Sequence, residues 1–144
     1  MAFSFTFDSN ILVAAIDDTD VHHRLVTGLD IWNTLENAVL FDVIIQETLT
    51  VLCRRAYQRG LKLDPIITRF MEMISTFETM QLSATANYYF DEILAAMRTQ
   101  KQFVSFHDYW LLFAARDLEH LTVISLDGAL ADVAPRGVKI VPGK

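Results

Sequence analysis

Short apolar runs alternate with segments of helical periodicity along the whole chain, and this alternation limits the possible folds more than any other feature. Strand-like runs are predicted at 3–7, 38–43, 79–83, 121–125 and 137–141. Helices are predicted over 9–16, 20–35, 44–59, 64–77, 85–98 and 105–119. Short strands that alternate with helices favour a parallel sheet with helices on both faces, so we predict an α/β fold.

The size and composition of the chain agree with a single packed domain over residues 1–144. Of its residues 52% are hydrophobic and 21% are charged, and there are no internal repeats. No apolar stretch reaches the length of about 18 residues that a membrane span needs. The N-terminus does not resemble a signal peptide, and a single cysteine suits a reducing compartment, so we expect a cytoplasmic protein. The net charge of −6 argues against a nucleic-acid binder, unless several acids hold a cation.

Four acidic residues stand at positions that a parallel sheet would bring together. Asp8 directly follows the run 3–7, and Asp127 nearly follows the run 121–125. Glu47 lies about one turn into a helix that follows a strand. Asp108 lies in the first turn of the helix that leads into 121–125. Because the carboxyl ends of parallel strands share one edge of a sheet, we predict that all four side chains gather at that edge.

Each of these acids also has an ordinary structural explanation. Asp8 and Asp127 could cap helices, Asp108 could form a capping box with Ser105, and Glu47 could complement a helix dipole. Four carboxylates crowded at one edge would nevertheless repel one another and raise each other's pKa. A bound cation relieves that repulsion, and oxygen ligands without a histidine or cysteine cluster favour Mg²⁺ or Mn²⁺. Such a site suits the hydrolysis of phosphodiester bonds.

The four segments that carry these acids resemble, in order and spacing, the motifs of the PIN-domain nucleases. They are FDSNIL, VIIQETLTVLCRR, SFHDYWLLFAARDLE and LTVISLDGAL, and within the family the chain is most similar to the toxin subunits of VapBC-type toxin–antitoxin pairs. The resemblance implies a three-layer α/β/α sandwich around a parallel sheet of four or five strands. It also implies an Mg²⁺- or Mn²⁺-dependent endoribonuclease whose metal and catalytic residues are Asp8, Glu47, Asp108 and Asp127. Ser125 would place a hydroxyl near the metal, and Ser9 and Asn10 would shape the first loop.

The partners implied by this resemblance are an RNA substrate, an antitoxin protein and a second copy of the chain in a homodimer. Arg98, Lys101 and His107 are candidate substrate contacts, because they lie close to Asp108 in the sequence. Two other functions stay open. One is a non-catalytic module whose acidic pocket docks a basic side chain of a protein partner, and the other is a different metal-dependent phosphoryl hydrolase on a similar sheet.

Two further groups of polar residues have simpler interpretations. His22 and His23 are adjacent, so on a helix their side chains would point about 100° apart and could not easily share one metal ion. We expect them on a solvated helix face. Arg54, Arg55, Arg59 and Lys62 form a local basic run, which indicates a solvated helix end or, as the alternative, a partner contact.

Overall fold

The strands of the computed structural model are short and parallel, and they form the middle of the fold. The structure describes residues 3–118, 120–134 and 136–141. The strands are β1 (Phe5–Phe7), β2 (Val39–Phe41), β3 (Glu78–Met80), β4 (Thr122–Ser125) and β5 (Val138–Ile140). One sheet has the order β1-β4-β5 and a second pairs β2 with β3. A single parallel bridge between Phe5 and Ala38 joins the two parts, so the strands follow the order β3-β2-β1-β4-β5.

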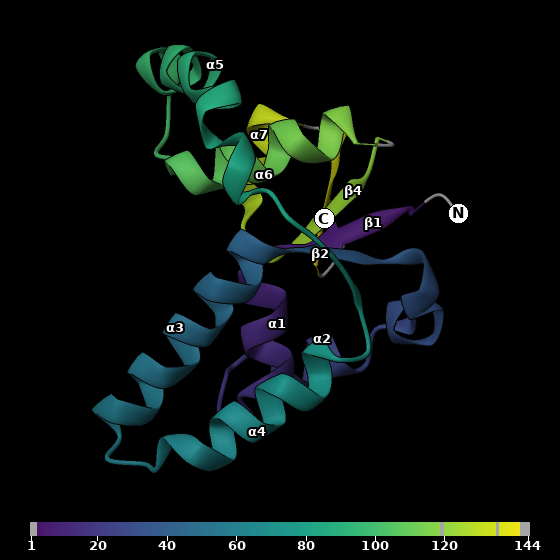
Figure 1. The fold of residues 1–144 in the computed structure, drawn as a ribbon, viewed down its shortest axis with the longest axis vertical. Coiled ribbons are helices and arrows are strands. Elements are labelled where there is room, and N and C mark those ends of the chain that lie inside the picture. Colours follow the sequence, from purple (N-terminus) through teal and green to yellow (C-terminus); the bar gives the residue numbers. More distant parts are fainter. Residues whose placement is uncertain (1–2, 119, 135, 142–144) are drawn as a thin grey trace.

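Helices cover both sides of these strands, as the sequence predicted. They are α1 (Ser9–Ile16), α2 (His23–Thr27), α3 (Asp42–Gln58), α4 (Leu63–Ile74), α5 (Ala86–Thr99), α6 (Phe106–Asp117) and α7 (Gly128–Val133), with 3₁₀ helices η1 (Asp30–Asn37) and η2 (Ser83–Thr85). Figure 1 shows α1 to α4 below the strands and α5 to α7 above them. The architecture is therefore the α/β/α sandwich that the sequence indicated.

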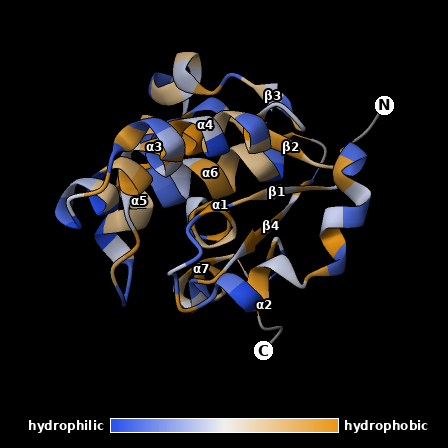
Figure 2. Cartoon of the chain, turned by 90° about the horizontal axis from the view of Figure 1, so that it is seen from below, coloured by the Kyte–Doolittle hydropathy of each residue, from blue (hydrophilic) through white to orange (hydrophobic). Residues whose placement is uncertain are grey.

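The main core lies between the strands and the helices that flank them. Phe7, Ile11, Leu111 and Ile124 are buried there, and each buried side chain of this size stabilises the fold by roughly 1.5–3 kcal/mol. In Figure 2, α1, β1 and β4 lie in the middle of the view and are mainly hydrophobic in colour. Helix α1 is apolar on nearly all sides. It has no polar face because strands and other helices surround it.

The helix predicted over 20–35 is wrong. The structure has the short helix α2 and the 3₁₀ helix η1 in its place, with a kink at Thr34. Side-chain hydrogen bonds compete with helix formation at its predicted start, because Asp20 Oδ1 accepts from the backbone N–H of His22. Near its middle, the chain turns at Gly28, and the indole of Trp32 donates a 2.6 Å hydrogen bond to the carbonyl of Val26.

Several other predicted boundaries differ from the observed ones by a few residues. Helix α3 begins at Asp42, inside the predicted strand, because the Asp42 carboxylate accepts from the backbone N–H of Val43 and Leu82. Helix α4 begins at Leu63, so Pro65 is its third residue, where the missing N–H costs no intrahelical hydrogen bond. Residue 119, at which the sequence predicted that the helix from 105 would end, lies outside the described residues.

Among the described helices, none is long and apolar enough to cross a membrane.

Candidate active site

Asp8 is the most deeply buried of the four predicted acids. It follows β1 directly, caps α1, and has a side chain that is only 4% exposed. Its Oδ1 accepts a 2.7 Å hydrogen bond from the backbone N–H of Ser9, and its own N–H donates to the carbonyl of Ile124 on β4. The capping explanation is therefore correct for Asp8, but it accounts for only one of the two carboxylate oxygens.

The second oxygen of Asp8 faces a small polar network at the carboxyl end of β4. The Ser125 hydroxyl donates to Asp8 Oδ2 at 2.9 Å, and Asn10 Nδ2 lies 3.3 Å from the same oxygen. Asn10 also donates to Ser125 Oγ and accepts from the backbone N–H of Leu126. The network holds the loops after β1 and β4 together, so it fixes the position of the Asp8 carboxylate.

Asp108 and Asp127 both take part in helix caps as well. The backbone N–H of Asp108 donates to Ser105 Oγ at 3.2 Å at the start of α6. Asp127 Oδ1 accepts from the backbone N–H of Ala129 at the start of α7, while its own N–H donates to Ser125 Oγ. Asp108 is half-buried and Asp127 is exposed, so both are more accessible to solvent than Asp8.

The charges of the four acids act on one another. Burial, the negative charge of Asp108 and that of Glu47 together raise the pKa of Asp8 to about 7, against the lowering effect of the hydrogen bonds from Ser125 and Ser9. Burial also raises the pKa of Asp108, and the negative charge of Asp127 raises it too. Hydrogen bonds with Ser105 act in the opposite direction and lower it. The charge of Asp8 therefore interacts with those of Asp108 and Glu47, and the charge of Asp108 interacts with that of Asp127.

The sequence matches no protein-family model and no curated protein, but the structure resembles several solved ones, two of which are described below. One is PAE2754 from Pyrobaculum aerophilum, with a TM-score of 0.67 and 16% identity over 96% of this chain and 84% of that one. The other is VapC20 of Mycobacterium tuberculosis, a toxin that cleaves the sarcin–ricin loop. Its TM-score is 0.66, at 17% identity over 91% of this chain and 95% of that one. The fold is PIN-like, of the VapC type.

In this PIN-like fold the oxygen donors are suited to a hydrated hard cation. Among the described residues, no group of three or more His, Cys, Asp or Glu side chains is placed so that it could hold a metal ion. Mg²⁺ commonly uses only one or two carboxylates and keeps several of its waters, so it does not need a group of that size. The Asp8 carboxylate, which burial and two neighbouring acids destabilise, fits a role as one of those ligands.

Sequence reasoning missed three polar residues next to the acids of the PIN-like fold. A pocket of about 290 Å³ is lined by Asn10 and Asp127 on one side and by Asp20, His22 and Arg55 on another. Arg55 belongs to the run interpreted as a solvated helix end, but its guanidinium pairs with Asp17 at 2.9 Å and with Asp20 at 2.8 Å. The acids at 17–20 are typical of a turn, but nothing in the sequence indicates that Arg55 on α3 would pair with them.

Of the three candidate substrate contacts, only His107 lies next to one of the four acids in the chain. His107 directly precedes Asp108 in the first turn of α6, and its ring lies against Phe106 and Trp110. Arg98 is exposed in the last turn of α5. Lys101 lines a different pocket, of about 460 Å³, whose described lining contains none of the four acids.

Proposed function

We propose that this chain is a divalent-metal-dependent endoribonuclease that cleaves phosphodiester bonds in RNA. The observation that supports the proposal most strongly is the buried Asp8 carboxylate. Its pKa is raised by burial and by Asp108 and Glu47, on a PIN-like fold at the carboxyl edge of a parallel sheet. A carboxylate held in this way at neutral pH is stabilised by a cation placed beside it.

Asp8, Glu47, Asp108 and Asp127 would hold Mg²⁺ or Mn²⁺. Such a cation, when bound, supplies an activated water and neutralises charge on the phosphate. The residues of the chain orient the ligands. Ser125 and Asn10 hold the Asp8 carboxylate through hydrogen bonds at 2.9 and 3.3 Å, and Ser105 holds the start of α6 that carries Asp108. Ser9 contributes the backbone N–H that binds the other oxygen of Asp8.

The proposal is tested by incubating total RNA with the purified protein in Mg²⁺, in Mn²⁺ and in EDTA. Wild type should cleave with either metal and not in EDTA, and Asp8→Asn should be inactive. Asp18→Asn is the matched control, because Asp18 is an exposed acid just beyond the same helix and should keep full activity. Cleavage that Asp8→Asn retains, or that is unaffected by EDTA, would contradict the proposed site.

A non-catalytic module is the second candidate, because a lysine or arginine of a partner protein would neutralise the same carboxylates. The two functions differ in their response to metal. The nuclease should be stabilised against heat by Mn²⁺ without any partner, whereas a docking module should be stabilised only by its partner. No metal-dependent change in melting temperature, together with no RNA cleavage, would favour the docking module.

We further propose two protein partners, an antitoxin that covers the acidic edge and a second copy of the chain, with cytoplasmic RNA as the substrate. Support for contacts between proteins comes from large apolar side chains that are exposed, including Tyr57, Met71, Tyr88 and Phe103. Light scattering at micromolar concentration should give the mass of a dimer. A monomer mass would remove the dimer from the proposal.

A further inference from the structure

A pocket next to the candidate active site is lined in part by His22, which lies in the turn before α2. Its volume is about 290 Å³, and Ser9, Asn10 and Asp127 form the wall shared with the acidic edge. His22, Asp20 and Arg55 form another part of its lining, and Val13, Val51 and Leu126 add apolar surface. Its volume lies near the lower end of the range of small-molecule sites, about 300–1,000 Å³, so it suits a ligand with the size of one nucleotide.

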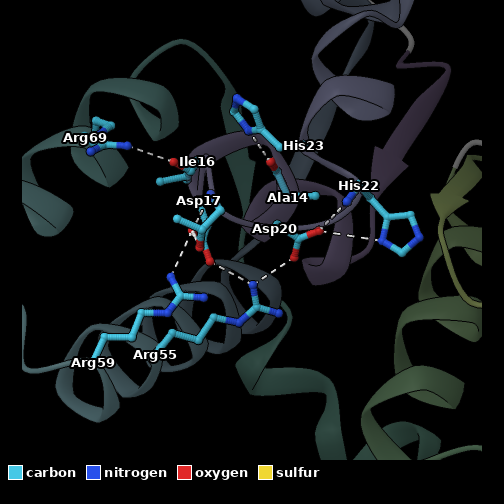
Figure 3. Close-up of polar contacts among 10 residues, drawn as sticks. Ala14, Ile16, Asp17, Asp20, His22, His23, Arg55, Arg59 and Arg69 are labelled. Atoms are coloured by element: carbon cyan, nitrogen blue, oxygen red, sulfur yellow. Dashed lines mark hydrogen bonds and ion pairs between the residues drawn. The ribbon is translucent and has the colours of Figure 1, made fainter.

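His22 is held at this pocket by a chain of polar contacts. Its backbone N–H donates to Asp20 Oδ1 at 2.8 Å, and its ring Nδ1 lies 3.6 Å from the same oxygen. Asp20 Oδ2 in turn accepts from Arg55 at 2.8 Å, and Figure 3 shows these contacts in line. Asp20 is 11% exposed and His22 is 49% exposed, so a buried acid anchors an accessible ring.

The second ring nitrogen of His22 is available to a ligand. Nε2 faces away from Asp20, and among the described residues it has no hydrogen-bond partner. Arg55 is not available in the same way, because its guanidinium is shared between Asp17 and Asp20. An imidazole N–H can donate a hydrogen bond to a phosphate oxygen, so Nε2 can serve as a phosphate contact.

We propose that this pocket binds one nucleotide of the RNA strand, next to the phosphodiester bond at the acids, and that His22 contacts its phosphate. The inference rests on the proposed function. It adds a position for the strand, which would run from the edge at Asp127 toward α2, with its base or sugar against Val13, Val51 and Leu126. His22 then acts in binding the substrate, while Asp20 and Arg55 position it.

Nuclear magnetic resonance of the histidine rings tests this contact without any need for cleavage. The chain has four histidines, which substitution can assign one by one. Adenosine and uridine 5′-monophosphates in Mg²⁺ should shift the ring signals of His22, and leave those of His23 and His120 unchanged. No shift of His22, or an equal shift with the same concentration of inorganic phosphate, would overturn the nucleotide pocket.

Steady-state cleavage of a short RNA gives a second, independent test. His22→Gln should raise KM by roughly 10- to 100-fold, the effect of losing one hydrogen bond to a charged group. Its Mn²⁺ affinity and melting temperature should not change. Arg24→Gln is the control, because it removes an exposed charge on α2 that does not line the pocket.

The outcomes of the two tests separate the inference from the proposed function. If wild type cleaves RNA and His22→Gln has an unchanged KM, the nucleotide pocket is wrong and the nuclease stands. If wild type cleaves no RNA under any condition, the nuclease is wrong, and the ring signals of His22 still decide whether the pocket binds a nucleotide.

Discussion

The Ser125 hydroxyl donates a 2.9 Å hydrogen bond to Asp8 Oδ2, joining the ends of two adjacent parallel strands across 117 positions of sequence. Ser125 Oγ also accepts from Asn10 Nδ2 and from the backbone N–H of Asp127. One fully buried hydroxyl therefore connects Asp8 with the loop that carries Asp127. The position of two proposed metal ligands depends on this single side chain.

Ser125→Ala should weaken both the fold and the site. Loss of a buried hydrogen bond should cost about 1–2 kcal/mol of unfolding free energy and leave Asp8 Oδ2 with a poorer partner. We also expect weaker Mn²⁺ binding, measured by calorimetry, and slower RNA cleavage. Ser75→Ala is the control, since the exposed Ser75 hydroxyl bonds only to the carbonyl of Glu72. Equal metal affinity in wild type and Ser125→Ala would contradict the role given to this hydroxyl.

Metal should stabilise the wild type more than Asp8→Asn. If Asp8 is a ligand, Mn²⁺ at about 100 times its Kd raises the unfolding free energy of the wild type by about 2.7 kcal/mol. The variant should gain much less, although without metal it should be as stable as wild type or slightly more so. Thermal melts with and without Mn²⁺ measure both differences. Asn is a good helix cap, so equal stabilisation of the two proteins would show that Asp8 is a cap and no ligand.

The metal-free protein should lose stability as the pH rises from about 4 to 7. Burial and the charges of Asp108 and Glu47 raise the pKa of Asp8 from 3.8 to about 7, so the folded protein binds this proton more tightly than the unfolded chain does. The stabilising effect is complete below the unfolded pKa and is lost as the pH rises through the folded value, with a total on the order of a few kcal/mol. Urea unfolding in EDTA at several pH values measures the slope, which should be smaller in Asp8→Asn. Identical slopes would show that Asp8 does not titrate in this range.

Thr6→Val should be neutral or stabilising. The Thr6 hydroxyl in β1 is fully buried, and its Oγ1 has no hydrogen-bond partner in the part of the chain that the structure describes. Replacing it by a methyl group of similar size removes a desolvation cost of about 1–3 kcal/mol. The buried Thr48 offers the opposite case, since its hydroxyl donates to the carbonyl of Ile44 at 2.7 Å. Thr48→Val should therefore lower the urea midpoint, and a similar loss in Thr6→Val would show that Thr6 has a partner.

Arg55→Met should destabilise the fold, whereas Arg54→Met should not. Burial raises the pKa of Asp17, but hydrogen bonds from Thr19 and Arg55 and the charge of Arg59 outweigh it and lower the pKa to about 2. Removing Arg55 leaves Asp17 and Asp20 without their shared partner. Because Arg55 is 35% exposed, we expect a moderate loss of about 1–3 kcal/mol. Arg54 is exposed on the same helix, so its replacement should change the unfolding free energy by less than about 0.5 kcal/mol.

The positions of the strands could be predicted because they depend on short-range patterns. An apolar run that ends at an acid, followed by helical spacing, is visible at Asp8 and at Asp127, whereas the gathering of the four acids at one metal site stays a prediction. The segment 17–37 could not be predicted in the same way. There the side chains of Asp17 and Asp20 bond to nearby backbone N–H groups, and the indole of Trp32 bonds to the carbonyl of Val26, so local side-chain hydrogen bonds override helical propensity.

The pocket at His22 could not be predicted from the sequence for a different reason. Its walls come from α1, from the turn before α2, from α3 and from the loop after β4, which meet only in the folded chain. Adjacent histidines suggest nothing specific, and a basic run on a helix usually faces solvent. His22 is held by its contacts with Asp20, which Arg55 in turn binds from α3.

Among the described strands, the boundary between β1 and β2 has the thinnest backbone connection, which consists of the bridge between Phe5 and Ala38 and a 2.8 Å hydrogen bond from the N–H of Ser4 to the carbonyl of Asn37. Glu47 stands on the β2 side of this boundary, whereas Asp8, Ser125 and Asp127 stand on the other side. A local opening there would draw Glu47 away from Asp8 while both halves stay folded. An ion bound by ligands from both sides would stabilise the closed boundary. Amide hydrogen exchange near Ala38 would therefore slow when metal is bound and report on metal occupancy at a distance from the carboxylates.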